Sequence, residues 1–577
     1  MSSILDGTLG DLSLQEDDVD LNETASIEQL QTADPRCGQP HTLSSLFTLN
    51  HDVLAEIMDY LSQSDQAHLA RTCHSLHIAT LPHRCSSHIQ LFPADRIVSS
   101  FLAFLRLNTL GESRAPLINK LYIAITTSRP VVDWQTALTR PTPGYRASFP
   151  WITDTILDIL AHCTNLGTLS INSWSARLPA DRLCNTIAAL DSLEDLHLAV
   201  TSDTLWAATT AFARLPRLRR LALHLAVEPS FSIDFVPIDP APLPLVATFS
   251  PQTLTELRLS YDRPARMDAC LPSVRRLHLT LTAQRTPENV LPTLVHAFPN
   301  LTSLTYGTRG WLGLDERTAA QWRGANRAWA RDVGRAAWPQ LNVLGGLDVR
   351  DLWVLGLAHK VPHVCVAEAD PFLGARRPGQ SRSGSEAAAW VRRMRRMLPA
   401  VLADARPTHL ELAVTWHLKA HWGEISKNGN SVETLGALRE CGGAPGASVT
   451  HLIVNVPAPE VLEDRIMAEL CAVLPNLVCT HLYVRVLRQP AEEARGPKYC
   501  ARLLLKVKQR SESYASSAAQ ASPSLSCVAF YLEGVSLQAW SISHPGGDGP
   551  RLEEMSESMG GACRREAVRA SERLLAE

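Results

Sequence analysis

Histidine and cysteine residues gather between positions 73 and 88, and both residue types are common ligands of zinc. The stretch contains Cys73, His74, His77, His83, Cys85 and His88. A structural zinc site usually includes a pair of cysteines at C-x₂₋₄-C spacing, and this stretch lacks one. The sequence therefore predicts no metal site here, and no other segment indicates a cofactor.

The motifs of common nucleotide-binding and hydrolytic enzymes are absent from the chain. The sequence contains no G-x-x-x-x-G-K-[ST], no H-E-x-x-H, no G-x-S-x-G and no helix-opening G-x-G-x-x-G. We therefore expect a protein that is not an enzyme and that acts by binding.

The overall composition limits the classes of partner and the cell compartments that the protein is expected to have. The 577 residues are 45% hydrophobic and 20% charged, with a net charge of −3, so no global field attracts nucleic acid or membrane. Thirteen scattered cysteines without a C-x-x-C pair are typical of free thiols in a reducing compartment. A basic, apolar secretory leader and an uninterrupted apolar span are both missing. We expect a cytoplasmic or nuclear location.

Three short amphipathic helices are predicted between residues 46 and 91. Val53, Leu54, Ile57 and Leu61 recur at helical spacing and form one apolar stripe. Turn-favouring residues follow at 62–65, and two further helices end near Pro82. Residues 88–91 then alternate polar and apolar, as a strand does. So short a segment cannot build a stable core alone, and we expect it to dock against another surface.

This segment resembles the F-box in the form common in fungal proteins. The resemblance rests on the pattern L-N-x-D-V-L-x-E-I-x-x-Y-L-x-x-x-D-x-x-x-L-A-x-T-C-x-x-L, which begins at Leu49. The family implies binding to a Skp-type adaptor and, through it, to a cullin–RING ubiquitin ligase. By that resemblance, the adaptor-binding positions are Leu49, Asn50, Val53, Leu54, Ile57, Leu61, Leu69 and Cys73. The family usually has proline where this chain has Asn50, which can instead cap the helix through its side-chain oxygen.

A second pattern, L-x-x-L-x-L after a helix break, recurs along the remainder. Clear copies are CTNLGTLSI (163–171), LDSLEDLHL (190–198), LPRLRRLAL (215–223), PQTLTELRL (251–259), LPSVRRLHL (271–279) and FPNLTSLTY (298–306). Weaker copies are WPQLNVLGG (338–346), SVTHLIV near 448 and LSCVAF near 525. In each copy the leucines turn inward from a short strand and the residues between them face outward. One such unit cannot bury its apolar face, but stacked units can.

The repeating part resembles a leucine-rich-repeat array. The fold class is therefore predicted as α/β, with a small N-terminal helical F-box followed by an irregular solenoid, or horseshoe. The asparagine that the family places after L-x-L is absent, which predicts less regular turns. A large doubly wound α/β domain is the alternative, because it also alternates helix and strand.

Composition predicts four regions along the chain. Residues 1–42 form an acidic tail, with nine acidic and one basic residue in the first forty. Residues 43–91 form the F-box-like module, 92–545 the repeat array and 546–577 a C-terminal helix or tail. Loop insertions are predicted near 228–250, 371–385 and 508–524, which are rich in proline, glycine or serine.

The outward-facing strand positions are the predicted client-binding residues. These are Arg219, Arg220, Arg258, Arg275, Arg276 and His278. Paired arginines favour acidic or phosphorylated clients, although they are equally typical of a solubilising surface. The resulting hypothesis is a substrate-recognition subunit of a Skp–cullin–F-box ubiquitin ligase. The alternative is a leucine-rich-repeat binding scaffold without ligase association.

Overall fold

The structure is a computed structural model, and residue contacts divide the chain into two units. One unit is Met1–Asn172 with Leu190–Leu193, and the other is Ser173–Ala189 with Glu194–Glu577. The described residues are 56–58, 61, 63–72, 74–86, 88–91, 95–106, 108–109, 112–124, 149–172, 180–200, 215–225, 252–261, 270–282, 290–309, 316–332, 337–346, 348–366, 384–413, 435–436, 438–439, 448–457, 464–487, 497–532, 535–545 and 549–556.

The first unit combines short helices with a parallel sheet ordered β1-β4-β5. Its helices are α3 (Gln63–Ala70), α4 (His74–Ser86), α5 (Asp95–Arg106), the 3₁₀ helix η4 (Ala115–Leu117) and α7 (Phe149–His162). Its strands are β1 (His88–Leu91), β4 (Lys120–Ala124), β5 (Thr168–Asn172) and the antiparallel pair β2 (Asn108–Thr109) and β3 (Glu112–Ser113). The strand at 88–91 is found where it was predicted, and α3 and α4 lie in the predicted helical segment. Helix α4 does not end near Pro82 as predicted but continues through it to Ser86. The first predicted helix lies mostly outside the described residues, so the three-helix module stays a prediction.

The second unit is a long open sheet with helices between many of its strands. Its strands are β6 (Asp195–Val200), β7 (Arg220–Leu225), β8 (Glu256–Tyr261), β9 (Arg276–Thr282), β10 (Ser303–Arg309), β11 (Val343–Gly346), β12 (His363–Val366), β13 (His409–Ala413), β14 (His451–Pro457), β15 (His481–Leu487), β16 (Cys527–Leu532), β17 (Val535–Ser543) and β18 (Arg551–Glu554). Its helices are α8 (Ala180–Ala188), α11 (Val290–Ala297), α12 (Glu316–Asp332), α13 (Val349–Leu355), α14 (Gly384–Ala405), α17 (Asp464–Val473), η9 (Leu474–Asn476) and α19 (Pro497–Ala521).

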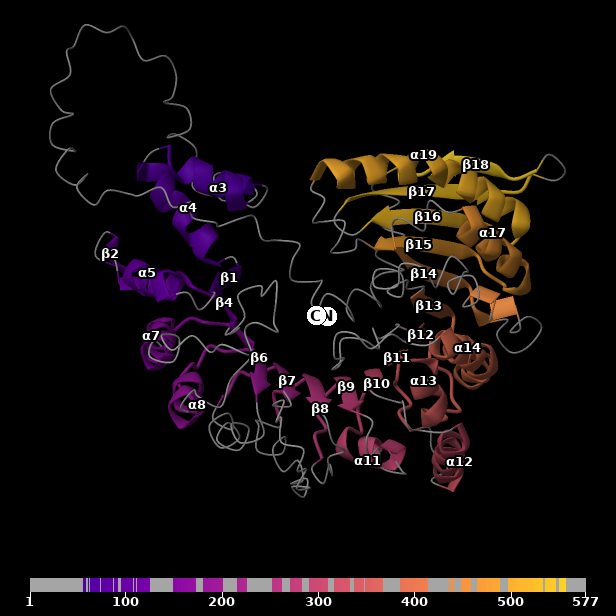
Figure 1. Ribbon diagram of the computed structural model, residues 1–577, viewed down its shortest axis with the longest axis horizontal. Helices are drawn as coiled ribbons and strands as arrows, with labels where there is room; N and C mark the ends of the chain where they lie inside the picture. Colours follow the sequence, from indigo (N-terminus) through magenta and orange to yellow (C-terminus); the bar gives the residue numbers. More distant parts are fainter. Residues whose placement is uncertain are drawn as a thin grey trace, which may run out of the picture. The chain divides into compact units, whose positions relative to one another are not determined.

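Strand order in this unit follows chain order from β6 to β18. Each strand from β6 to β16 is parallel to the next, whereas β17 and β18 add antiparallel at the end. Figure 1 shows α11, α12, α13 and α14 along one side of these strands. A doubly wound domain would reverse its strand order at a switch point, and this sheet does not.

The repeated leucines form continuous buried rows across the sheet. Every predicted L-x-x-L-x-L copy ends in a strand, which confirms the strands β5 to β11, β14 and β16. Leu196, Leu221, Leu257, Leu277 and Leu304 are partners in register and are at most 2% exposed. Each row is therefore buried by its neighbours, as stacked repeats require.

Gly346 shows how a helix is fitted closely to the sheet. It ends β11 at a position where the two neighbouring strands carry Tyr306 and Val366. A Cβ atom at Gly346 would lie 2.5 Å from Leu352 Cγ of α13. The helix begins at once, because Asp348 accepts a hydrogen bond from Arg350 N and Asp351 reaches back to Asp348 N, both at 2.9 Å.

Side-chain hydroxyls join the turns that precede the strands. Oγ1 of Thr255 donates to the Arg219 carbonyl (3.2 Å), and Oγ1 of Thr302 to the Arg275 carbonyl (3.1 Å). Later turns repeat the contact through Thr408, Thr450, Thr480 and Ser526. These residues form a hydroxyl ladder that stabilises successive turns. The hydroxyl ladder lies in the turn before each strand. The asparagines that leucine-rich repeats usually have, and that this chain lacks, would follow the strand.

Two predictions near the C-terminus are wrong. Residues 508–521 belong to α19 and are not a loop insertion, because Ser511, Tyr514, Ala515, Ala518 and Ala519 form one buried helical face. Residues 551–554 form strand β18, where a helix or tail was predicted. Segments 1–42, 228–250 and 371–383 lie outside the described residues, so their predictions stay untested.

Candidate functional site

The N-terminal helices contain a small apolar cluster around Met58 and Leu76. Met58 is 0% exposed, and the half-buried side chains of Leu61 and Leu69 pack against it and Leu76. Gln66 Nε2 donates to the Met58 carbonyl at 2.8 Å and ties α3 to the preceding turn. Met58 was missed by the sequence analysis, although it follows Leu54 by four residues and precedes Leu61 by three, which is helical spacing.

The predicted adaptor-binding residues therefore divide into two kinds. Leu61 and Leu69 belong to the apolar cluster, whereas Ile57 is 36% exposed to solvent. The other five predicted positions, Leu49, Asn50, Val53, Leu54 and Cys73, lie outside the described residues. Ile57 is accordingly the described position at which an adaptor contact can be tested without disturbing a buried core.

Three of the predicted client-binding arginines are paired with acids on the same strand face. Asp195, Arg220, Glu256 and Arg276 are register partners on β6 to β9, so acid and base alternate across the sheet. Arg220 pairs with Asp195 through two hydrogen bonds. Glu256 receives Arg258 Nε at 2.8 Å and Arg276 Nη1 at 3.4 Å. Two carboxylates thus hold three arginines, and each guanidinium group already has an acidic partner, which makes these arginines poorer anchors for an acidic client than unpaired ones would be.

Arg219 and Arg275 lie in the turns just before the strands and are exposed. Arg219 Nε is 3.9 Å from Glu194 Oε2, and both side chains remain largely in solvent. Arg275 Nη1 donates to the Asn300 carbonyl at 3.2 Å, a contact that leaves its charge uncompensated. His278, on the strand face, is 3.3 Å from the Thr280 hydroxyl. The predicted client-binding arginines thus fall into two groups. Arg219 and Arg275 lie in turns and are exposed, whereas the strand arginines are paired with acids.

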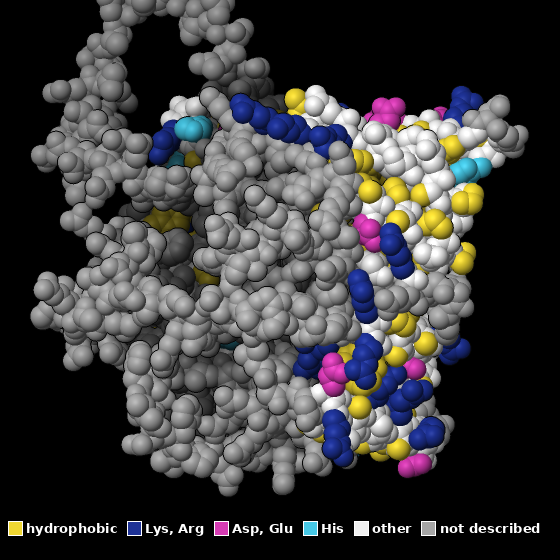
Figure 2. Space-filling model, turned by 45° about the vertical axis from the view of Figure 1, so that its right-hand side comes forward, with side chains coloured by type: hydrophobic (Ala, Val, Ile, Leu, Met, Phe, Trp, Pro, Cys, Tyr) yellow, Lys and Arg dark blue, Asp and Glu magenta, His cyan; other side chains and the backbone are white. Residues whose placement is uncertain are grey.

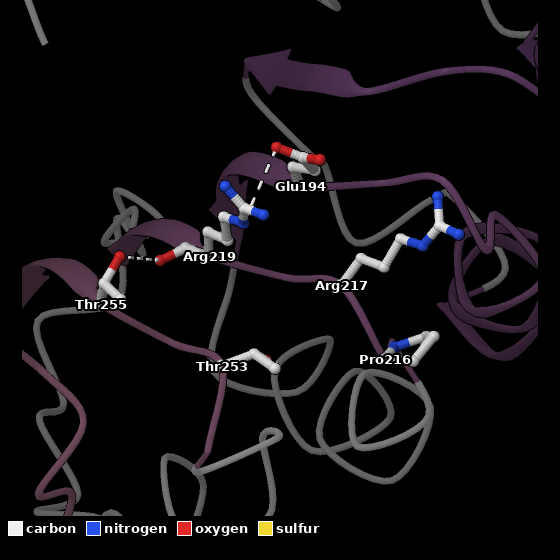
Figure 3. A pocket seen from close by; sticks show the side chains of 6 residues that line it. All are labelled: Glu194, Pro216, Arg217, Arg219, Thr253 and Thr255. Carbon is white, nitrogen blue, oxygen red and sulfur yellow. Dashed lines mark hydrogen bonds and ion pairs between the residues drawn. The ribbon is translucent and has the colours of Figure 1, made fainter.

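A hollow of about 520 Å³ opens beside the turns before β7 and β8. Its lining consists of Glu194, Pro216, Arg217, Arg219, Thr253 and Thr255. Figure 3 shows the Arg219 side chain extending toward Glu194, whereas the Arg217 side chain extends away from both. Arg217 is exposed and has no ion pair with another described residue. Sequence analysis missed Arg217, because it precedes the strand and was not counted among outward strand positions.

A row of four stacked histidines crosses strands β12 to β15. His363, His409, His451 and His481 are register partners, with ring centroids 5.9, 4.1 and 4.5 Å apart in that order. The sequence signal was the recurrence of T-H-L at 408–410, 450–452 and 480–482, which the leucine pattern obscured.

The threonine before each of three of these histidines fixes which ring nitrogen carries the proton. Each of Thr408, Thr450 and Thr480 donates its single hydroxyl proton to the preceding turn, so its oxygen can only accept from the Nδ1–H of the next residue, at 2.9–3.0 Å. Burial first, and then the neighbouring histidines, lower the pKa of His409 and of His451 to about 4. Both rings are therefore neutral at pH 7.

A buried carboxylate lies beside the histidine row. Glu411 is fully buried, accepts a hydrogen bond from Asn455 Nδ2 at 2.7 Å, and lies 3.6 Å from His363 Nε2. Burial alone would raise the pKa of Glu411, but His363, Asn455 and Arg485 together lower it. The arrangement holds an ionised carboxylate in place.

Helix α19 presents a basic surface that the sequence analysis did not single out. Arg502, Lys506, Lys508 and Arg510 are exposed along it, and Arg510 contacts the Tyr514 hydroxyl at 3.3 Å. Figure 2 shows a row of Lys and Arg side chains at the top of the face, where Figure 1 has α19. These cations are spread along one solvent-facing helix surface.

Described cysteines are free, and burial suppresses the reactivity of most of them. Burial raises the pKa of Cys85 to about 11 and that of Cys163 to about 12, so both stay as thiols. Among the described residues, no group of three or more His, Cys, Asp or Glu side chains is arranged to hold a metal ion. Within the same residues, no helix is long and apolar enough to cross a membrane.

Comparison with known proteins adds no relative to this description. No family model matches the chain, and no curated protein matches it.

Proposed function

We propose that this protein is a substrate receptor of a Skp–cullin–F-box ubiquitin ligase, acting in the cytoplasm or the nucleus. In this proposal, the N-terminal helices bind a Skp-type adaptor and the strand array binds a client protein. The chain would carry no catalytic group of its own, since the transfer of ubiquitin belongs to the other subunits.

The observation that carries the proposal is the sheet of the second unit. Its strands follow chain order and are parallel from β6 to β16, and this supports a leucine-rich-repeat-like solenoid. Such a sheet presents long rows of side chains, one residue per strand, as extended protein-binding surfaces do. The polar residues of the face change from strand to strand, from ion pairs on β6 to β9 to histidines on β12 to β15. A variable row of this kind suits recognition of one particular client.

The adaptor half of the proposal is supported by the F-box-like sequence and by the cluster around Met58. That cluster gives α3 and α4 a common core, while Ile57 stays partly exposed beside it. An exposed isoleucine on a small helical module is a suitable contact for an apolar partner surface.

The affinity of the full chain for a recombinant Skp-type adaptor tests this half, measured by titration calorimetry. We expect Ile57→Asp to weaken binding at least about tenfold, because it places an unpaired carboxylate in an apolar interface. Ala103→Asp, at an exposed site on α5, is the matched control and should bind as the wild type does. If the folded wild-type chain does not bind the adaptor, the ligase proposal fails.

Asn50 favours a second candidate, a binding scaffold that lacks ligase association. It stands where the F-box family usually has proline, so the adaptor contact of the proline ring is missing. Asn50→Pro separates the two candidates in the same assay. A large gain of adaptor affinity would favour the scaffold, and an unchanged, already tight affinity would favour the receptor.

A further inference from the structure

We propose that the exposed basic face of α19 is a docking surface for an acidic polypeptide segment that carries an apolar residue among its carboxylates. This α19 face consists of Arg502, Leu505, Lys506 and Lys508, all of which are exposed. It lies on a helix and not on the strand rows that form the proposed client surface. The inference therefore goes beyond the proposed function and does not depend on it.

Helix α19 is the last helix among the described residues, and it lacks a neighbour that inner helices of a solenoid have. It packs against α17 and covers β16 and β17. The described chain then continues in β17 and β18, which add antiparallel strands without a further helix. In a solenoid, the helix of the next repeat would pack against α19. The end of the array thus leaves a helix surface open to a partner.

The charge of α19 is almost entirely of one sign. All five of its basic residues lie between positions 498 and 510, and Glu512 is its one acidic residue. Arg502, Lys506 and Lys508 make no ion pair with another described residue, and the row of Lys and Arg side chains is visible at the top of Figure 2. A surface that only keeps a protein soluble mixes both signs. Clustering of one sign favours an anionic partner.

These cations do not stabilise the helix that carries them. Lys506 lies four residues from both Arg502 and Arg510, and like charges at this spacing destabilise a helix. Lys498 lies in the first turn, where the helix dipole disfavours a cation. Carboxylates of a partner would relieve this repulsion, and that relief contributes to binding.

Leu505 gives the α19 face an apolar centre. It is 55% exposed, and the described part of the chain has only two other exposed large apolar side chains, Ile57 and Val478. Arg502 and Lys508 lie three residues before and after it, so they flank it on the helix surface. An apolar anchor surrounded by polar residues is the usual arrangement at the centre of a protein-binding surface.

The α19 face suits a polypeptide better than a membrane or a nucleic acid. A helix that binds a membrane inserts its apolar face into the lipid, but Val507 and Tyr514 of α19 are buried within the protein. Single-stranded nucleic acid stacks on exposed aromatic side chains, and the described residues of this face include none. The net charge of −3 also opposes nucleic-acid binding by the whole chain.

The test uses the full chain and a fluorophore-labelled peptide of glutamate and glycine with one central leucine. Binding is measured by fluorescence polarisation at about 50 mM salt to limit screening. We expect the triple variant Arg502→Gln, Lys506→Gln, Lys508→Gln to weaken binding at least about tenfold, because it removes three charged contacts. Leu505→Gln should weaken it about fivefold through lost apolar contact. Unchanged binding in either variant would overturn the proposal.

A matched control removes the same charge elsewhere in the chain. The variant Arg217→Gln, Arg317→Gln, Arg331→Gln replaces three exposed arginines outside α19 and should bind as the wild type does. An equal loss in this control would reduce the interaction to net charge and overturn the proposal. The α19 triple variant should also be at least as stable as the wild type in urea unfolding, because it relieves like-charge repulsion. A marked loss of stability would assign these cations a structural role instead.

Four further ligands fix the chemical class. A peptide with glutamine in place of glutamate should bind at least about tenfold more weakly. A peptide with glycine in place of leucine should bind about fivefold more weakly and should not respond to Leu505→Gln, since the contact is already absent. An oligothymidine or phosphatidylserine vesicles that bind as tightly as the acidic peptide, with the same response to the variants, would contradict a polypeptide partner. The assay contains no adaptor, so its result is independent of the ligase test.

Discussion

Neutral histidines at the centre of the sheet depend on the threonine before each of them. Because Thr450 gives its proton to the Thr408 carbonyl, His451 must carry its own proton on Nδ1. The ring is then held against His409 and His481 at 4.1 and 4.5 Å between centroids. Protonation would place like charges at this separation in a partly buried site, which is unfavourable.

As the pH falls, protonation of these histidines should therefore destabilise this part of the sheet before carboxylates become protonated. The folded pKa of His409 and of His451 is about 4, against 6.5 for the free side chain. The unfolded chain binds more protons between these values, so stability is present above pH 6.5 and is lost as pH falls toward 4. With allowance for partial exposure, we expect a loss of about 1 kcal/mol per histidine between pH 7 and pH 5.

The double variant His409→Asn, His451→Asn isolates this effect from the other histidines. Asparagine keeps a side-chain N–H for the threonine oxygen but does not titrate. In urea unfolding followed by circular dichroism, the variant should lose about 2 kcal/mol less than the wild type between pH 7 and pH 5. An equal pH dependence of the two proteins would show that these rings are not the acid-sensitive groups.

At the scale of elements, the sequence predicted best where leucines alone fill the buried rows. The strands β5 to β11 follow L-x-x-L-x-L, whose two leucines are buried on one face. Five of the described strands of the main sheet beyond β4 were missed, namely β12, β13, β15, β17 and β18. The first three carry histidine before their apolar residues, and β12 also follows Pro362, so their pattern differs from the leucine repeat.

Helix α19 escaped prediction for a different reason. Within the segment predicted as a loop, its buried face consists of Ser511, Tyr514, Ala515, Ala518 and Ala519, which are small or polar. Such residues bury well against a sheet only when tertiary contacts supply partners, and Ser511 is 2.7 Å from the Gln538 amide of β17. Composition alone favours a serine-rich loop there, because propensity scales do not include that contact.

The arginine site was predicted in part. Arg219 was foreseen as a client-binding residue, but the sequence does not reveal which arginines have an acidic partner. That distinction depends on register, since Asp195 meets Arg220 and Glu256 meets Arg276 only when the strands align.

The hydroxyl ladder gives an element-scale prediction with an internal control. Thr450→Val removes both the bond to the Thr408 carbonyl and the acceptor of His451 Nδ1, in a half-buried turn. We expect a loss of about 1 kcal/mol in the free energy of unfolding. Thr255→Val removes only an exposed bond, so its cost should stay within about 0.5 kcal/mol. Equal costs in urea unfolding would show that the ladder contributes the same at every turn.

At the scale of the whole molecule, the two proposed binding functions lie in different units. The F-box-like helices belong to the first unit, and the arginine hollow and the histidine row belong to the second. Ile57→Asp should therefore weaken adaptor binding and leave client binding by the second unit unchanged. This separability is what a receptor that joins a client to a ligase requires.

The most direct test of the receptor proposal is the mass of the particle that the full 63.3 kDa chain forms with a Skp-type adaptor and the N-terminal region of a cullin. Size-exclusion chromatography with light scattering gives that mass. The proposal predicts a single 1:1:1 complex. A chain that stays monomeric while adaptor and cullin elute together would contradict the ligase-receptor function.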